Sequence, residues 1–418
     1  MTQEERYIKM TETPISRLIP SLAIPTIISM LVTSIYNMAD TFFVSRISTS
    51  ASAAVGVSYS LMAMIQALGF TLGMGSGNYL SRVLGSRDEE KAERIASTGF
   101  YTAIFVGLVF AAICLPNLDL LVRLLGATDT IAPYAKDYAK YILMAAPVMT
   151  GALSMNNLLR FQGLAVYSMI GITTGGILNM ILDPILILGF GPFPRLEVVG
   201  AAVATVTSQI LVLIVMLIRI MHSDLEPNIL QNMHVLSRFP AKYYISIFKI
   251  GFPTAVQSSI YCMISMILTR MVSAFGAGAI ATQRVGGQIE SVSWNTADGF
   301  AAALNAFVGQ NYGAKKPDRI RKGYNISFKI LAVWGLIVTG AFVFLPGPIA
   351  SLFFHEKDVL AIAINYLIII GFSETFMTIE LMTIGALSGL GMTKLCSIIS
   401  IIMTVMRIPL AMLLCATA

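Results

Sequence analysis

Charged residues are scarce in this chain of 418 residues, where Asp, Glu, Lys and Arg together make up only 12%. Soluble domains carry roughly 25%. Hydrophobic residues reach 56%, and the mean hydropathy is +0.77. A single soluble core cannot bury such an excess of apolar side chains. The composition therefore excludes a soluble protein and favours one that spans a membrane.

Residues that carry enzyme chemistry are also few. The four cysteines fall inside apolar runs, where free thiols behave as small hydrophobes. The three histidines, His222, His234 and His355, are far apart in polar stretches. Their spacing predicts neither a zinc site nor a catalytic triad, and the sequence has no Walker A motif. We therefore expect no enzyme activity, no cofactor and no metal site other than one for a coupling Na⁺.

Eleven apolar runs are long enough to cross a hydrocarbon layer about 30 Å thick, which takes roughly 20 helical residues. The chain starts MTQEERYIKM, without the apolar segment of a secretory signal, so the first run is expected to be a span of the mature protein. The expected spans are Leu18–Val44, Ala51–Leu80, Ile95–Leu115, Pro133–Leu158, Val166–Phe190, Val199–Met221, Ile245–Val272, Gly278–Val308, Ile326–Leu345, Leu360–Leu387 and Leu395–Cys415.

Basic residues separate the loops on the two sides of these spans. One side holds most of them, for example Arg82, Arg87 and Lys91 after the second span and Arg160 after the fourth. Such an excess marks the cytoplasmic side of a membrane protein, so we expect a cytoplasmic N-terminus in a prokaryotic cytoplasmic membrane. The same clustering accounts for the net charge of +6, and nucleic-acid binding is not expected.

Landmarks in the sequence recur at one offset. AIPT at Pro25 recurs as GFPT at Pro253, and 253 − 25 = 228; Gly85 recurs as Gly313, and 313 − 85 = 228. A long internal repeat predicts two homologous helical bundles. The RFQG loop and its later counterpart keep the same register. With six spans in a bundle, both copies enter the membrane in the same direction.

The repeat also predicts the domain organisation. We expect an N-terminal lobe of six spans over residues 1–222, a cytoplasmic linker over 223–241 and a C-terminal lobe over 242–418. The offset places the partner of the sixth span beyond Ala418, so the second bundle is expected to have five helices and to lack its last one. A C-terminally incomplete sequence and a natural eleven-span protein both fit this pattern.

Acidic residues inside the first bundle are the main functional candidates, because a charge in the bilayer costs roughly 2.5–3.5 kcal/mol. Asp40 lies in the first span, three residues after Asn37. Asp183 lies in the fifth span, four residues after Asn179 and just before Pro184. These spacings place each pair on one helix face. A buried clamp that ties helices together is the alternative to a functional role.

The second bundle does not repeat these acids. The positions that are 228 residues after Asp40, Asn179 and Asp183 hold Leu268, Arg407 and Ala411. Arg407 needs a counter-charge among the acids of its own lobe, and a structural ion pair and a substrate contact both remain open. The polar candidates of this lobe are Gln288, Glu290, Asp298, Glu374 and Glu380.

The chain resembles the multidrug and toxic compound extrusion (MATE) family over essentially its whole length. The matching segments are AIPT and YNMADTFFV in the first span, RFQG, NMILDP, GFPT, QNYGA and RIP. The resemblance implies an all-helical fold of two six-helix lobes around a V-shaped central cavity. It also implies that H⁺ or Na⁺ entry drives the export of lipophilic organic cations. The match is to the prokaryotic branch that resembles DNA-damage-inducible exporters.

Site residues carried over from this resemblance fall into two sets. The implied coupling-ion site consists of Asp40, Asn179 and Asp183, with Asn37 orienting the ion and Thr205 as a further ligand. The segment QSSIYCM lacks the acid that a sodium-coupled branch of the family carries there. The residues expected near substrate are Tyr36, Asn156, Asn157, Gln288 and Glu374.

These observations predict a monomeric secondary antiporter that exports drugs or toxic compounds. A lipid-linked oligosaccharide flippase of the same superfamily is the alternative, but its cavity should be lined with Arg and Lys for pyrophosphate. A membrane-embedded enzyme is a further alternative, which the lack of paired metal ligands argues against. The sequence does not distinguish H⁺ from Na⁺ and does not name the substrate.

Overall fold

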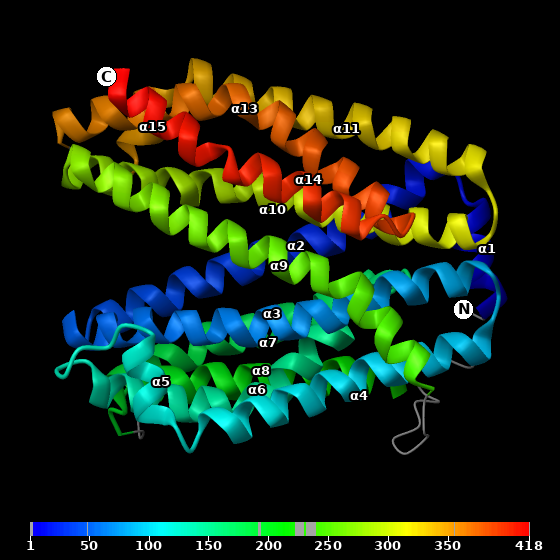
Figure 1. Cartoon of the computed structure of the whole chain (residues 1–418), viewed down its shortest axis with the longest axis horizontal. Helices are drawn as coiled ribbons and strands as arrows, with labels where there is room; N and C mark the ends of the chain where they lie inside the picture. The colour runs from blue at the N-terminus through cyan, green and yellow to red at the C-terminus, as the bar shows by residue number, and fades with distance from the viewer. Residues whose placement is uncertain are drawn as a thin grey trace.

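The computed structural model describes residues 3–47, 49–190, 194–221, 230, 240–354 and 356–417. These residues form long helices that run roughly side by side, without a strand in the described ranges (Figure 1). His222, His234, His355 and most of the expected linker lie outside the described residues. The helices are α1 (Gln3–Glu12), α2 (Ile15–Ser45), α3 (Thr49–Gly85), α4 (Glu89–Cys114), α5 (Leu118–Leu124), α6 (Ala132–Phe161), α7 (Ala165–Leu188), α8 (Glu197–Met221), α9 (Ala241–Val272), η1 (Ser273–Phe275), α10 (Ala277–Gly313), α11 (Pro317–Phe344), α12 (Pro346–Ser351), α13 (Lys357–Gly389), α14 (Thr393–Val405) and α15 (Arg407–Thr417).

Ten helical segments in the described part are long and apolar enough to cross a membrane, with α14 and α15 counted as one segment. The remaining expected span, Gly278–Val308, lies on α10, a helix of 37 residues that does not meet this criterion. Its composition explains the difference, because α10 carries Gln288, Glu290 and Asp298 among its apolar residues. Each expected span lies on one long helix, except Leu395–Cys415, which is divided between α14 and α15, and the chain is a multi-pass membrane protein.

The helices repeat in the register that the sequence predicts. α3 covers residues 49–85 and α10 covers 277–313, which is an offset of 228 at both ends. α4 begins at Glu89 and α11 at Pro317, again 228 residues later, and the short helices α5 and α12 begin at Leu118 and Pro346. The repeat therefore extends from sequence landmarks to helix ends.

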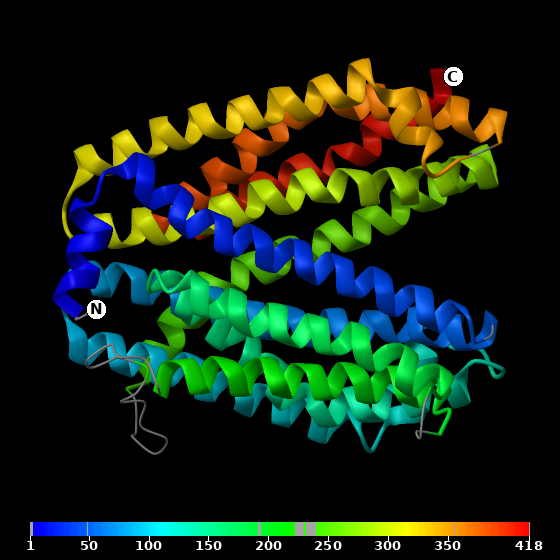
Figure 2. The same cartoon turned by 180° about the vertical axis from the view of Figure 1, so that it is seen from behind.

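Two helices cross between the lobes. In Figures 1 and 2 the helices α3–α8 lie in one half of the molecule and α10–α15 in the other. On α2, the side chains of Leu18 and Leu22 pack against Phe300 and Leu304 of α10, whereas the later part of α2 packs on α7. On α9, Ile247 packs against Leu72 of α3. Each lobe thus contributes one helix to the surface of the other.

The last span is broken near Pro409. α14 ends at Val405 and α15 begins at Arg407. Proline lacks a backbone N–H, and its ring clashes with the carbonyl four residues earlier, which here belongs to Val405. The equivalent helix of the first lobe, α7, contains Pro184 and continues through it to Leu188.

Candidate functional site

A cavity of about 520 Å³ lies among α2, α3, α6, α7, α8 and the facing side of α10. Aromatic rings of Tyr36, Tyr59, Phe70 and Trp294 form part of its wall, and the rest combines apolar and polar side chains. A cavity of this size, with apolar rings and a few polar groups, suits an amphipathic small molecule. The amide side chains on its wall are Asn37, Gln66, Asn156, Asn179, Gln209 and Asn295.

A buried polar cluster lies on α2 and α7, next to this cavity. Asp183 is fully buried, and the Asn179 amide donates to its Oδ1 at 3.4 Å, one helical turn away. Asp40 is close enough to Asp183 for the two carboxyl groups to interact electrostatically. The hydroxyl of Tyr138, on α6, lies beside both acids and beside Thr205 of α8. The sequence-predicted Asp40, Asn179, Asp183 and Thr205 are therefore brought together from three helices.

Three oxygens of this cluster have no hydrogen-bond partner among the described residues: Asp40 Oδ1, Asn179 Oδ1 and Asp183 Oδ2. A buried acceptor without a donor is costly, and burial of a carboxyl group disfavours its charged form. A bound proton would supply a donor, and oxygen atoms are the ligands that hard cations such as Na⁺ prefer. These three oxygens are therefore suited to bind either a proton or Na⁺. No group of three or more His, Cys, Asp or Glu in the searched residues forms a metal centre.

Asn37 is placed differently from the expectation that it orients the ion. Its side chain is exposed and lines the cavity. One turn of helix separates it from Asp40, so it lies at the border between the cavity and the buried cluster.

The five residues expected near substrate separate in the structure. Tyr36 and Asn156 line the cavity, and the Asn156 Oδ1 accepts a hydrogen bond from Ser168. Asn157 is fully buried and donates to the Leu153 carbonyl at 2.9 Å, on the side of α6 that faces α3. Gln288 and Glu374 belong to the other lobe and do not line this cavity.

Glu374 is a second buried acid, on α13. It is fully buried, and both of its carboxylate oxygens lack a hydrogen-bond partner. Ser293 and Glu290 of α10 lie near it, but the Ser293 hydroxyl makes no hydrogen bond within the described residues. Glu290 is also the acid that interacts electrostatically with Arg407, whose guanidinium lies 5.8 Å from the Tyr261 ring centroid. Arg407 therefore has a counter-charge, at longer range than a direct ion pair.

Arg160 is the charged cavity residue that the sequence analysis missed. Sequence analysis counts it among the loop bases, but the structure places it in the last turn of α6, where it lines the cavity. Its electrostatic partner is Asp298 of α10, in the opposite lobe. These two are the only charged side chains among the described lining residues. Asp298 was expected only as one of several polar residues of the second lobe, and no motif linked it to Arg160.

Comparison with known proteins identifies the fold. A family model described as MatE matches residues 25–185 and matches again over residues 253–413. The chain belongs to the MatE family. Both limits of the two matches are 228 residues apart, since 253 − 25 = 228 and 413 − 185 = 228. The MatE unit is thus the internal repeat of this chain. Members of this family are membrane transporters.

Relatives within the MatE family include transporters with different cargo. The chain is 28% identical to an FAD transporter of Shewanella oneidensis over 359 residues, which is 85% of this chain and 78% of that protein. It is 27% identical to the multidrug export protein MepA of Staphylococcus aureus over 317 residues, 75% of this chain and 68% of that protein. A solved MOP superfamily transporter from Pyrococcus furiosus superposes with a TM-score of 0.84 at 26% identity, covering 96% of this chain and 88% of that one.

Proposed function

We propose that this protein exports amphipathic aromatic compounds in exchange for H⁺ or Na⁺, and that the coupling ion binds at Asp40, Asn179 and Asp183. The observation that carries this proposal is the group of three buried oxygens without a donor, directly beside a cavity with aromatic walls. The relatives that export drugs support the direction of transport. The protein acts as a monomer in this proposal, because one chain supplies the whole site.

α2 links ion binding to lobe movement in this mechanism. It carries Asp40 near one end, packs closely on α7 at Gly176, and contacts the second lobe through Leu18 and Leu22. Neutralising Asp40 and Asp183 removes the repulsion between two carboxylates, so α2 and α7 can pack differently. Each ligand then favours the arrangement of the lobes that it binds better, which is how an exchange is coupled.

Ethidium efflux from proteoliposomes provides the test. A pH gradient or a Na⁺ gradient is imposed separately, and accumulation is followed by fluorescence. A fiftyfold gradient of H⁺ or Na⁺ is worth about 2.3 kcal/mol, which in one-for-one exchange can sustain roughly fiftyfold accumulation. Asp40→Asn and Asp183→Asn should abolish gradient-driven efflux, whereas the exposed Asp137→Asn should leave it unchanged. Unchanged transport in the Asp40→Asn/Asp183→Asn double variant would make these acids structural clamps.

The end of the molecule that carries α1 is cytoplasmic in this proposal. The loops at this end contain Arg87, Lys91, Lys315 and Lys316, in agreement with the positive-inside rule. A reporter fused after Arg94 or Lys322 should therefore read cytoplasmic, and one after Arg195 should read external. An external reading after Arg94 contradicts the orientation.

An anionic aromatic compound such as FAD is a second candidate substrate. Arg160 and Trp294, on facing helices, both line the cavity, and arginine pairs well with phosphate and stacks on aromatic rings. The FAD transporter among the relatives motivates the choice of probe. Transport of FAD that is lost in Arg160→Gln, while ethidium efflux is retained, would favour this substrate class. The single cavity arginine, matched by Asp298, argues against the flippase alternative.

A further inference from the structure

Helix α1 lies across the end of the molecule and touches both lobes (Figure 2). Glu4 pairs with Arg87 of the α3–α4 loop at 2.9 Å, and Glu12 pairs with Lys316 of the α10–α11 loop at 3.5 Å. The Asn311 amide of α10 donates to the Met10 carbonyl at 3.1 Å. α1 is therefore held in one orientation, with one of its faces against the protein.

Arg6 lies on the buried face of α1. Its side chain is only 9% exposed, and both Nε and Nη2 are buried without a hydrogen-bond partner. Burial lowers the pKa of Arg6, but an arginine side chain stays charged in proteins. Native proteins rarely leave a buried guanidinium without partners, because its desolvation is costly. Within the described residues, no side chain accepts a hydrogen bond from these two nitrogens, so they are available to an added ligand.

A cleft of about 220 Å³ lies beside this guanidinium, between α1 and the turn that joins α6 to α7. Arg6 and Lys9, three residues apart on α1, provide two positive charges on its wall, and Tyr167 of α7 also lines it. Gln162 contributes a buried Oε1 that also lacks a hydrogen-bond partner. The remaining wall is apolar and consists of Met10, Leu164 and Val166, with the turn glycine Gly163.

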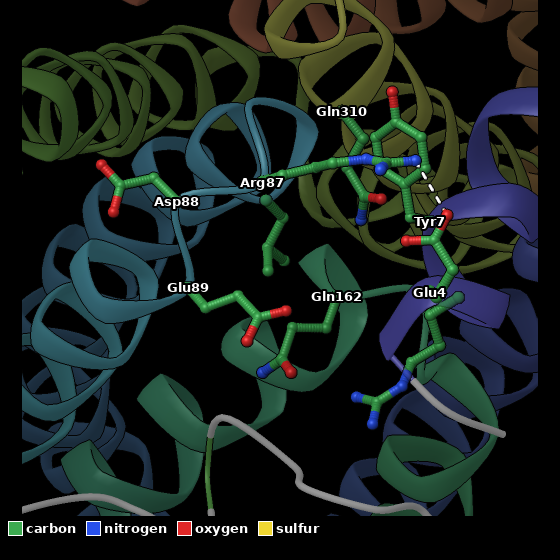
Figure 3. Close-up of a pocket in the computed structure, with 9 residues that line it drawn as sticks. Glu4, Tyr7, Arg87, Asp88, Glu89, Gln162 and Gln310 are labelled. Carbon is green, nitrogen blue, oxygen red and sulfur yellow. Dashed lines mark hydrogen bonds and ion pairs between the residues drawn. The ribbon is translucent and has the colours of Figure 1, made fainter.

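Acidic residues lie in the adjoining hollow and not in the cleft. Figure 3 shows this hollow, in which Arg87 reaches Glu4 while Gln162 and Glu89 lie on the other side. Glu89 attracts Arg6 electrostatically, but the two groups form no ion pair within 4 Å in the described part of the chain. Tyr167 interacts with Arg6 from α7. Arg6 and Gln162 line both the hollow and the cleft, and the described polar residues of the cleft are two cations, a phenol and the Gln162 amide.

We infer that this cleft binds the headgroup of an anionic phospholipid, with the phosphate on Arg6 and Lys9 and a headgroup hydroxyl on Gln162 Oε1. Guanidinium and ammonium groups form strong charge-assisted hydrogen bonds to phosphate. The free amide oxygen needs a donor, which a glycerol headgroup has and a choline headgroup lacks. The best match is therefore phosphatidylglycerol.

The position of the cleft favours a lipid over a soluble phosphate. It opens at the first turn of α7, where the span begins, and Val166 on its wall is 47% exposed. Basic clusters beside membrane spans attract anionic lipids, whose charge is concentrated at the membrane surface. An apolar wall next to the cations offers contact for the glycerol backbone, which an inorganic ion would not use. A bound lipid would hold α1 at the membrane surface on this side of the protein.

Native mass spectrometry of the full chain, released from nanodiscs, tests this site. Nanodiscs of phosphatidylglycerol are compared with nanodiscs of phosphatidylcholine, and retained lipid is counted. We expect retention of phosphatidylglycerol only, weakened about fivefold in Arg6→Gln and again in Lys9→Gln, as expected for each cation near the surface. Arg321→Gln removes an exposed positive charge at the same end and should retain lipid like the wild type.

Competition with soluble phosphates distinguishes a bound lipid from a bound phosphate ion. Inorganic phosphate and glycerol 3-phosphate at millimolar concentration should not displace the lipid; displacement would assign the site to a soluble phosphate and overturn the lipid. Equal retention of both lipids, or equal loss in Arg321→Gln, overturns the site. Lys9→Gln remains informative if Arg6→Gln does not fold, and lipid retention is measured independently of transport.

Discussion

The two halves of this transporter have the same helices and different chemistry. α3 and α10 coincide at both ends after a shift of 228 residues, yet Asp40 corresponds to Leu268 and Asp183 to Ala411. The first lobe combines two buried acids across α2 and α7, whereas the second has Glu374 on α13, where the first lobe has Ala146. The difference separates what the fold requires from what one lobe adds to it.

The two lobes share the backbone geometry at the ends of α3 and α10, where these helices contact each other. Gly85 ends α3 and Gly313 ends α10, and a Cβ on either would collide with backbone of the other helix. Arg87 and Lys315, which follow these glycines at equivalent positions, both have a left-handed backbone, with φ of 59° and 56°. The repeat therefore preserves a close, symmetric contact between helix ends.

The largest effect is expected when an acid that only the first lobe has is removed. Asp183→Asn should reduce gradient-driven accumulation by roughly fiftyfold when a fiftyfold gradient of H⁺ or Na⁺ is imposed. Glu374→Gln should weaken substrate binding but leave the response to the gradient intact. The measurement is ethidium efflux against imposed pH and Na⁺ gradients. The opposite result, with coupling lost only in Glu374→Gln, would move the ion site to the second lobe.

A smaller effect is expected from the shared contact. Gly85→Ala and Gly313→Ala should each destabilise the protein by about 1–3 kcal/mol, the usual cost of an overpacked site. Thermal unfolding in detergent measures the change.

Two glycines serve as matched controls for this prediction. Gly56 on α3 and Gly287 on α10 have open space where a Cβ would lie. Gly56→Ala and Gly287→Ala should be neutral or stabilising, because alanine favours helix by about 0.5–1 kcal/mol. Equal Tm changes at all four positions would contradict a close contact between the lobes.

The charge pair between the lobes gives a third, weaker effect. Asp298→Asn leaves Arg160 as the one charged side chain on the described cavity wall, so the apparent affinity for cationic ethidium should fall about fivefold to tenfold. Arg160→Gln should change it in the opposite direction. The double variant restores neutrality and should approach the wild type in a titration of efflux rates. Equal losses in both single variants would indicate a structural role for the pair.

Sequence analysis predicted the helices and the repeat because apolar runs and glycine landmarks are local signals. It also selected Asp40 and Asp183, since acids inside apolar runs stand out. It did not bring Arg160 to the cavity, because the end of an amphipathic run can lie in a loop or in the last helical turn. Tyr138 joined the cluster only through packing of α6 on α8, which carries Thr205. The assignment of α2 to one lobe was incomplete, because hydropathy does not show which partner a crossing helix contacts.

The smallest expected effect concerns an ion network that only the first lobe has. Asp119 on α5 accepts from Lys136 at 2.8 Å and from Arg123 at 3.1 Å. The positions equivalent to Asp119 and Lys136 are Gly347 and Ile364, whose side chains carry no charge.

This network predicts a pH dependence confined to the first lobe. The hydrogen bond from Lys136, followed by that from Arg123, lowers the pKa of Asp119 below its ordinary value of 3.8. A lowered pKa in the folded state means that Asp119 stabilises the protein above pH 3.8 and that this contribution is lost as the pH falls through the lower folded value. Because the group is exposed, Asp119→Asn should lower Tm only slightly at pH 7, and the difference from the wild type should disappear in acid. Asp137→Asn, an exposed acid beside Lys136, should leave Tm unchanged at both pH values. A difference between wild type and Asp119→Asn that grows as the pH falls would show that the network does not depend on the ionised carboxylate.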